Sequence, residues 1–175
     1  MGFDLNIEYG FEFLSGYVDI NYFATKLLNR SIEDDIYGDV NFDCLGYFNG
    51  DCDNLIDYPV FDFKHRMTVG YSRGDLELQA VWKYVSSLKD GNDAVEYYTE
   101  TLDAYSLIDL SGRYQINENF ALILGVKNLF DEQPQPIGSN SWEWLKEDIG
   151  TFSNTYTQYY DVFGRTMFLK LSARF

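Results

Sequence analysis

The sequence is poor in several residue types, and each shortage excludes a class of protein. It holds three Pro, two Cys and one His among 175 residues. No run of about eighteen apolar residues occurs, so the chain has no candidate membrane-spanning helix. Lys and Arg number 13 against 28 Asp and Glu, which leaves a net charge of −15. Because phosphate binding needs a basic face, this balance excludes a nucleic-acid partner.

Motifs for catalysis, metals and cofactors are missing as well. The chain has no Gly-rich phosphate loop, no H-E-x-x-H and no C-x-x-C. Ser86 and Lys89 form an S-x-x-K pattern, but no companion motif accompanies it. Asp51, Asp53 and Asp57 lack the glycine turn and the distal Glu of a calcium loop. We therefore predict no catalytic residue, no metal ligand and no cofactor, and the chain is not expected to be an enzyme.

Aromatic residues are abundant. Fifteen Tyr, 14 Phe and 3 Trp bring the aromatic share to 18%. Aromatic side chains suit pleated, half-buried surfaces, so the composition favours strands. The acid excess fits a solvated surface, which is the simpler interpretation, or a funnel for cationic or metal-bearing ligands.

Apolar and polar residues alternate along most of the chain. Such a two-residue period is typical of strands with one polar and one apolar face. Several of the segments approach or exceed ten residues, enough for a tilted strand to cross a bilayer. We expect strands at residues 2–11, 18–28, 66–71, 76–84, 108–116, 120–127 and 167–175.

The connections alternate in length, and this alternation indicates a membrane barrel. Short turns are expected at residues 14–16, 73–75 and 117–119, and long loops at 31–62, 89–103 and 131–160. Transmembrane β-barrels combine short periplasmic turns with long extracellular loops. The fold class is therefore all-β, a portion of an antiparallel transmembrane β-barrel. Its lumen is expected to receive the charged side chains of Arg66, Lys83, Arg113, Lys127 and Lys170.

Seven strands do not complete such a barrel. Bacterial single-chain barrels have an even number of strands, and an open edge in hydrocarbon leaves backbone groups unpaired. Met1 also leads directly into a strand pattern, with no basic segment of a signal peptide before it. We expect residues 1–175 to be the C-terminal part of a longer barrel protein, in which the first and last strands both descend to the periplasm.

Two motifs carry a resemblance to a known family. The run 125–131, G-V-K-N-L-F-D, is followed by Pro134 and contains Asn128, Leu129, Phe130 and Asp131. It resembles the penultimate-strand signature of TonB-dependent receptors, G-V-x-N-L-F-D/N. The tail from residue 160 to Phe175, with its Gly164–Arg165 pair, resembles the closing strand of that family. The plug domain and the energy-coupling box of the family have no counterpart in this chain.

The resemblance implies a receptor in the bacterial cell outer membrane that takes up a scarce ligand with energy coupled through TonB. Siderophore-iron, cobalamin and saccharides are the ligand classes it implies. Its implied partners are outer-membrane lipid, the barrel-assembly machinery, the remaining strands and plug domain, and TonB through the missing N-terminal part. A passive porin or structural barrel, and a soluble β-rich binding module, remain alternatives.

Three groups of residues are candidates for specific roles. Cys44 and Cys52 lie close together in an expected extracellular loop, where a disulfide is the default for an exported protein. The resemblance implies that the last strand, with Leu169, Leu171, Ala173 and Phe175, is an assembly signal, and anchoring by Phe175 at the interface is the alternative. The aromatic side chains of Trp142, Trp144 and Tyr156 could either stack on a ligand or pack within the loop, and both interpretations remain open.

Overall fold

The computed structural model describes residues 1–34, 40–48, 59–91, 101–136, 155–156 and 159–174. Its main element is a seven-stranded sheet in the order β1-β2-β6-β7-β10-β11-β12, in which every pair is antiparallel. The described part of the chain contains no helix that is long and apolar enough to cross a membrane. The strands of the sheet are β1 (Gly2–Phe13), β2 (Gly16–Leu27), β6 (Phe63–Arg73), β7 (Leu76–Val85), β10 (Tyr105–Gln115), β11 (Phe120–Lys127) and β12 (Thr166–Ala173).

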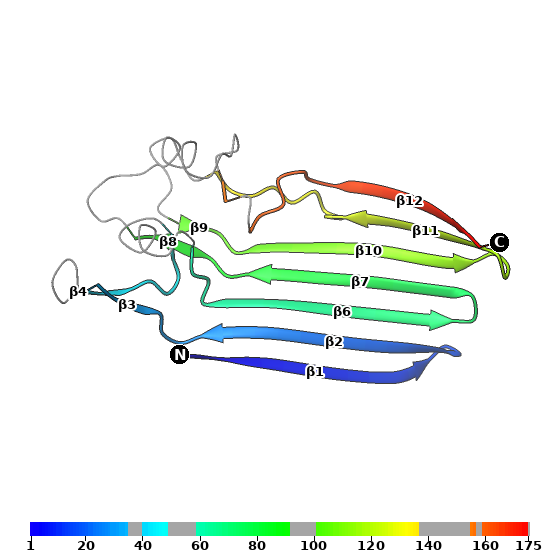
Figure 1. Ribbon diagram of the computed structural model, residues 1–175, viewed down its shortest axis with the longest axis horizontal. Helices are drawn as coiled ribbons and strands as arrows, with labels where there is room; N and C mark the ends of the chain where they lie inside the picture. The colour runs from blue at the N-terminus through cyan, green and yellow to red at the C-terminus, as the bar shows by residue number, and fades with distance from the viewer. Residues whose placement is uncertain (35–39, 49–58, 92–100, 137–154, 157–158, 175) are drawn as a thin grey trace.

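The seven predicted strands and the alternation of short and long connections are confirmed. Tight turns lie at one end of the sheet and the long connections at the other (Figure 1). In the first turn, Leu14 and Ser15 have φ values of 48° and 60°. Two consecutive positive φ values match a two-residue turn whose twist suits the flanking strands. β1 starts at the long-connection end, and β12 runs in the same direction (Figure 1).

The long connections contain short strands where only irregular loops were expected. β3 (Ser31–Asp34) and β4 (Val40–Asp43) form a hairpin. β5 (Tyr47–Phe48) pairs in parallel with β8 (Leu88–Asp90), which pairs in turn with β9 (Thr101–Leu102). Pairings of two to four residues are too short for a clear periodic signal and depend on tertiary contacts, which explains why the prediction missed them.

The register separates an apolar face from a polar face. One row across the sheet joins Tyr9, Ile20, Val69, Ala80, Leu110, Val126 and Met167. The next row joins Gly10, Asp19, Gly70, Gln79, Ser111, Gly125 and Phe168. Because side chains alternate between faces, the two rows lie on opposite sides. The five cations predicted to face a lumen all share the face of the second row.

The apolar face is open over its whole width. Leu5 on β1 is 43% exposed and Leu169 on β12 is 74% exposed. A soluble sandwich would cover such a face with a second sheet, and no described element does so. Exposure of apolar strands on this scale fits a lipid-facing surface.

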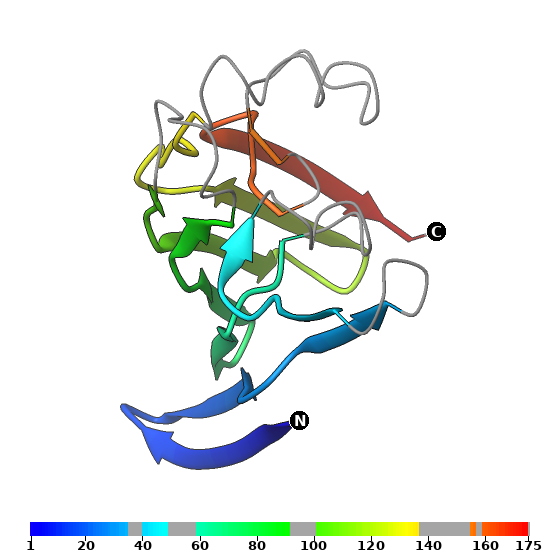
Figure 2. The ribbon, with the colours of Figure 1, turned by 90° about the vertical axis from the view of Figure 1, so that its left-hand side faces the viewer.

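The sheet is curved into an arc that is not closed (Figure 2). The buried cluster of the molecule lies where the long connections gather, over the end of the polar face. Tyr105 and Leu107 contribute to it from β10, on the same face as Ser111. The cluster consists of Phe48, Phe61, Leu88, Leu102, Tyr105, Leu107, Tyr156 and Tyr160, and we call it the cap cluster.

Candidate functional site

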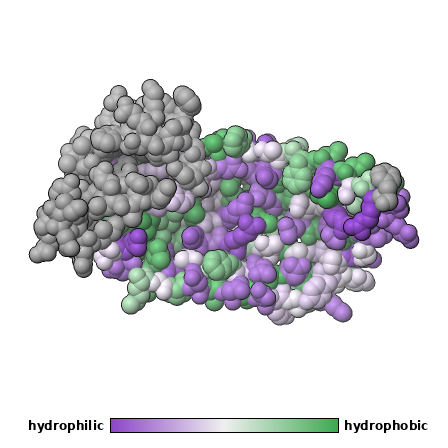
Figure 3. Space-filling model, viewed as in Figure 1, coloured by the Kyte–Doolittle hydropathy of each residue, from purple (hydrophilic) through white to green (hydrophobic). Residues whose placement is uncertain are grey.

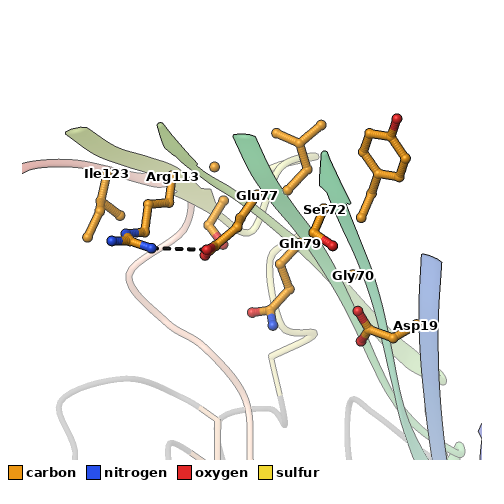
Figure 4. Close-up of a pocket in the computed structure, with 11 residues that line it drawn as sticks. Asp19, Gly70, Ser72, Glu77, Gln79, Arg113 and Ile123 are labelled. Atoms are coloured by element: carbon orange, nitrogen blue, oxygen red, sulfur yellow. Dashed lines mark hydrogen bonds and ion pairs between the residues drawn. The ribbon is translucent and has the colours of Figure 1, made fainter. Parts of the chain in front are cut away.

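The polar face is the candidate functional surface, and it contains a hollow near the tight-turn end. Hydrophilic residues gather across the middle of the face seen in Figure 3. The hollow, which we call the Asp19 hollow, has a volume of about 350 Å³ and extends from β2 to β11. Figure 4 shows Asp19, Gln79, Glu77 and Arg113 projecting from the same side of the sheet into this region.

Small residues in the wall create the hollow. Gly70 and Ser111 belong to the row that also contains Asp19 and Gln79. A Cβ atom built on Gly70 would overlap the Asp19 carboxylate. The Asp19 side chain therefore lies across the neighbouring strand, over the space that glycine leaves free.

The polar groups of the hollow differ in how well they are paired. Arg113 Nη1 lies 3.0 Å from Glu77 Oε1, and its Nη2 donates to Gln115 Oε1 at 2.6 Å. Both partners of the ion pair are largely exposed, so the pair adds little stability. Asp19 and Gln79 form no hydrogen bond or ion pair with any residue that the structure describes.

Charges on the polar face are sorted by strand. β1 and β2 contribute only acids, and none of these is in an ion pair within the described ranges. The acidic stripe consists of Asp4, Glu8, Glu12 and Asp19. β6 to β12 contribute six cations against two acids. These eight residues are Lys64, Arg66, Glu77, Lys83, Asp109, Arg113, Lys127 and Lys170, and Lys83 pairs with Asp109 at 2.7 Å.

The predicted family motif forms a corner at the end of β11. Asn128 is 1% exposed and adopts the left-handed φ of 51°. Its backbone N–H donates to Asp109 Oδ1 at 2.9 Å. Its side chain holds the backbone of Glu132 in both directions, with Nδ2 donating to the carbonyl and Oδ1 accepting the N–H, each at 2.8 Å. A short amide side chain that tolerates left-handed backbone suits this position.

The second half of the motif joins this corner to the start of β12. Asp131, with φ of 58°, accepts the backbone N–H of Arg165 at 2.7 Å. Gly164 has φ of 67°, and a Cβ atom there would lie 2.7 Å from Asp131 Oδ1. Leu129 donates its N–H to Ile108 O at 2.8 Å. The structure thus brings together five of the six motif residues, whereas Phe130 is 70% exposed.

The other predicted site residues are only partly described. Cys44 is fully buried and is not a free thiol. Cys52 lies outside the described residues, so its pairing with Cys44 stays a prediction. Trp142 and Trp144 also lie outside them. Tyr156 is 1% exposed and packs edge-on against Phe48, with ring centroids 6.5 Å apart.

The cap cluster also holds Tyr160 in an apolar setting. The Tyr105 and Tyr160 rings meet edge-on, with centroids 5.0 Å apart. Burial, reinforced by Tyr105, raises the pKa of Tyr160 to about 12. Tyr160 is therefore neutral near pH 7, and the cap cluster is held by packing of uncharged aromatic and leucine side chains.

The predicted assembly strand has its apolar residues on the lipid-facing side. Leu169 and Leu171 lie opposite Leu124 and Leu122 of β11, and Ala173 lies opposite Phe120. Phe175 lies outside the described residues. The other edge of β12 has no partner strand among the described elements. The role of β12 and Phe175 as an assembly signal stays a prediction.

Sequence reasoning missed an aromatic cluster around His65. His65 lies 4.4 Å from Trp82 and 5.2 Å from Tyr84, measured between ring centroids, and Tyr84 stacks on it. Tyr22 and Phe63 complete the cluster. The register could have revealed it, because His65 lies directly opposite Tyr84. The described residues contain no group of three or more potential metal ligands of the His, Cys, Asp and Glu types.

Solved structures of three receptors and transporters share the fold. The copper transporter OprC is 18% identical, with a TM-score of 0.53 over 99% of this chain and 23% of its own. The ferric-catecholate import receptor Fiu from E. coli K12 is 14% identical, with a TM-score of 0.51 over 98% and 27%. A G324V mutant of the ferric enterobactin receptor PfeA from Pseudomonas aeruginosa is 17% identical, with a TM-score of 0.50 over 98% and 30%.

The chain thus spans between 23% and 30% of the length of these three proteins. No curated protein sequence matches it. The family model described as "TonB dependent receptor-like, beta-barrel" matches residues 1–129, which is more than half of the chain. Together with the seven-stranded sheet and its two distinct faces, this match shows that the chain belongs to the TonB-dependent receptor β-barrel family.

Proposed function

We propose that the chain forms the C-terminal wall of an outer-membrane receptor that imports a scarce ligand with energy coupled through TonB. Members of this family are outer-membrane proteins of Gram-negative bacteria, and they act as receptors and transporters. The observation that carries the proposal is the division of the sheet into an open apolar face and a charged polar face. Such a wall separates lipid from an aqueous or protein-filled lumen.

The long connections supply the mouth of the receptor. They gather at the end opposite the tight turns, and the cap cluster packs them over the polar face. A ligand from outside reaches this cap before it reaches the lumen wall. The segment around Trp142 and Trp144 belongs to the same set of connections and is our candidate for ligand contact.

The ligand belongs, by our proposal, to the siderophore-iron, cobalamin or saccharide class. The similar structures are receptors for ferric enterobactin and ferric catecholates and a copper transporter, by their names. At identities of 14% to 18%, these structures share only their fold with this chain. The choice among the ligand classes therefore rests on experiment.

The test is uptake by cells that carry the complete receptor encoded with this chain. Labelled ferric siderophores, cobalamin and oligosaccharides are offered one at a time, with and without a protonophore and in strains with and without TonB. We expect accumulation of one class that requires both TonB and the proton-motive force. Uptake that continues without either would instead favour a passive porin. Recovery of the protein in the soluble fraction would favour the soluble binding module.

Variants of the loop that contains Trp142 and Trp144 separate ligand recognition from the integrity of the barrel. Trp142→Ala and Trp144→Ala are compared with Phe130→Ala, an exposed aromatic residue at the rim. We expect the loop variants to weaken ligand binding at the cell surface and the Phe130 variant to bind normally. Equal loss in all three variants would contradict a role of the loop aromatics in recognition.

A further inference from the structure

We propose that a notch between two neighbouring tight turns binds the headgroup of a phospholipid that carries both a phosphate and a primary ammonium group. This is the chemistry of phosphatidylethanolamine, taken from the periplasmic leaflet of the outer membrane. The inference rests on the membrane wall of the proposed function, but not on its energy coupling. It goes beyond that function by assigning a lipid class, a leaflet and a set of residues to the contact.

The notch lies where the hairpins β1–β2 and β6–β7 end side by side. The pairing of β2 with β6 reaches Tyr17 and Ser72 at this end. Beyond that pair each strand turns back into its own hairpin, so the two turns are neighbours at the same end of the sheet (Figure 1). The space between them has a volume of about 580 Å³ and is lined by residues 12–17 and 72–74. We call it the turn notch.

The turn notch is open to both faces of the sheet. Glu12 lies opposite Tyr17 in a row of the polar face, whereas Phe13 and Arg73 belong to the apolar face. Neighbouring residues of a strand point to opposite sides, so Glu12 and Phe13 reach the notch from different faces. Gly16 lies opposite Phe13 and has no side chain to fill the gap beside it. A headgroup that enters from the lipid side can therefore extend to the polar side around the end of the sheet.

The charges of the turn notch match a headgroup with one negative and one positive group. Its two charged residues are Glu12 and Arg73. Neither side chain forms an ion pair or a hydrogen bond in the part of the chain that the structure describes. The Arg73 guanidinium is a planar fork of donors that suits a phosphate, and the Glu12 carboxylate accepts hydrogen bonds from an ammonium group. A purely anionic headgroup would satisfy Arg73 but would be repelled by Glu12.

The position of Arg73 on the apolar face places the notch at the depth of lipid headgroups. An arginine on the lipid face is costly at the middle of the bilayer and nearly free of cost near the interfaces. Arg73 is the last residue of β6, directly before a tight turn. Because the tight turns of such barrels face the periplasm, the headgroups at this level belong to the periplasmic leaflet.

Two exposed apolar side chains beside the notch provide contacts for acyl chains. Phe13 is 51% exposed, and Leu14, in the first turn, is 69% exposed. The Tyr71 hydroxyl donates to Leu14 O at 3.4 Å, which ties this turn to a side chain of the apolar face. Tyrosine rings suit the level between acyl chains and headgroups. A soluble ligand would leave these apolar contacts unused, so the surroundings of the notch favour a lipid.

The experiment measures lipid binding to the complete receptor in detergent by native mass spectrometry. Phosphatidylethanolamine, phosphatidylglycerol and phosphatidylcholine with identical acyl chains are titrated separately, and glycerophosphoethanolamine serves as the soluble headgroup without acyl chains. The variants are Arg73→Gln, Arg73→Lys and Glu12→Gln. The matched controls are Arg66→Gln on the same strand as Arg73 and Glu8→Gln on the same strand as Glu12, and neither position lines the notch. Heat-modifiable migration in gels verifies that each variant has a folded barrel.

We expect the unmodified receptor to bind phosphatidylethanolamine more tightly than the other two lipids. Arg73→Gln should weaken this binding about 10-fold, the order expected for the loss of one hydrogen-bonded contact to a charged group, while Arg73→Lys should retain most of it. Glu12→Gln should weaken phosphatidylethanolamine and strengthen phosphatidylglycerol, because it removes the partner of the ammonium group and the repulsion of an anion together. Both controls should bind like the unmodified receptor.

Equal binding of the three lipids by the unmodified receptor would overturn the proposal. So would losses in Arg66→Gln and Glu8→Gln as large as those in the notch variants, or binding of glycerophosphoethanolamine as tight as that of the intact lipid. None of these readouts depends on TonB. Selective lipid binding by a receptor with passive uptake would therefore uphold the turn notch and refute the proposed function, and TonB-dependent uptake without lipid selectivity would do the opposite.

Discussion

Replacing Asn128 by Ala should destabilise the corner between β11 and β12. The change deletes two hydrogen bonds of 2.8 Å to the Glu132 backbone in a residue that is 1% exposed. Each of these hydrogen bonds contributes a net of about 0.5–1.5 kcal/mol, so the two together contribute about 1–3 kcal/mol. Alanine also tolerates the φ of 51° less well than Asn, at roughly 1 kcal/mol. We expect a total loss of about 2–4 kcal/mol.

Asn128→Gly is the variant that separates the two contributions. Glycine keeps the left-handed backbone at no steric cost but loses the same two side-chain hydrogen bonds. It should therefore be less destabilising than Asn128→Ala by roughly 1 kcal/mol. The Asp109 acceptor of the Asn128 backbone N–H remains in both variants, so a difference between them reports the backbone conformation alone.

The assay is local hydrogen exchange in the complete receptor. The amides of Leu129, Glu132 and Arg165 are all hydrogen-bonded in the corner. The expected loss in Asn128→Ala corresponds to roughly 30- to 700-fold faster opening, since each 1.4 kcal/mol is tenfold. Wild-type exchange in Asn128→Ala, or greater destabilisation by Gly than by Ala, would refute the reasoning.

Three further predictions concern the cap, the rim and the terminus. Mass spectrometry of non-reduced peptides should find Cys44 joined to Cys52, and two free thiols in exported protein would contradict this; the small loop limits the stabilisation to less than the roughly 3 kcal/mol of a 15-residue loop. Burial alone raises the pKa of Asp62, but hydrogen bonds from Lys26 and Ser86 outweigh it and hold that pKa below 3.8. The stabilisation from Asp62 is therefore present above pH 3.8, and it should be lost as the pH falls through the lower pKa of the folded state. In Asp62→Asn, amide hydrogen exchange near residues 26, 62 and 86 should lose this pH dependence. Deleting Phe175 should lower surface levels in cells while refolding into micelles is nearly unchanged, and equal losses in both assays would favour a plain interfacial anchor.

The regular part of the fold could be predicted from residue alternation alone. In β11, Phe120, Leu122, Leu124 and Val126 alternate with Ala121, Gly125 and Lys127, and the structure places the two sets on opposite faces. A strand has only one such division, so the faces follow directly once the period is recognised. The tight turns then give three neighbouring pairs, β1–β2, β6–β7 and β10–β11, because each turn joins the two strands of a hairpin.

The candidate site could be predicted only in fragments. The motif residues Asn128 and Asp131 were found by resemblance, but their hydrogen bonds depend on positive φ values that a sequence does not display. The Asp19 hollow depends on the register between strands, because Gly70 accommodates Asp19 from the neighbouring strand. The aromatic cluster around His65 was missed for the same reason, since Tyr22, Trp82 and Tyr84 lie on neighbouring strands.

The parallel pairing of β5 with β8 ties two separate connections into one unit. Lys89 N–H donates to Gly46 O, and Gly91 N–H donates to Phe48 O, each at 2.8 Å. An insertion or deletion within either paired segment would shift this register. A graft of either connection onto another barrel therefore has to include both, because each supplies the pairing edge of the other.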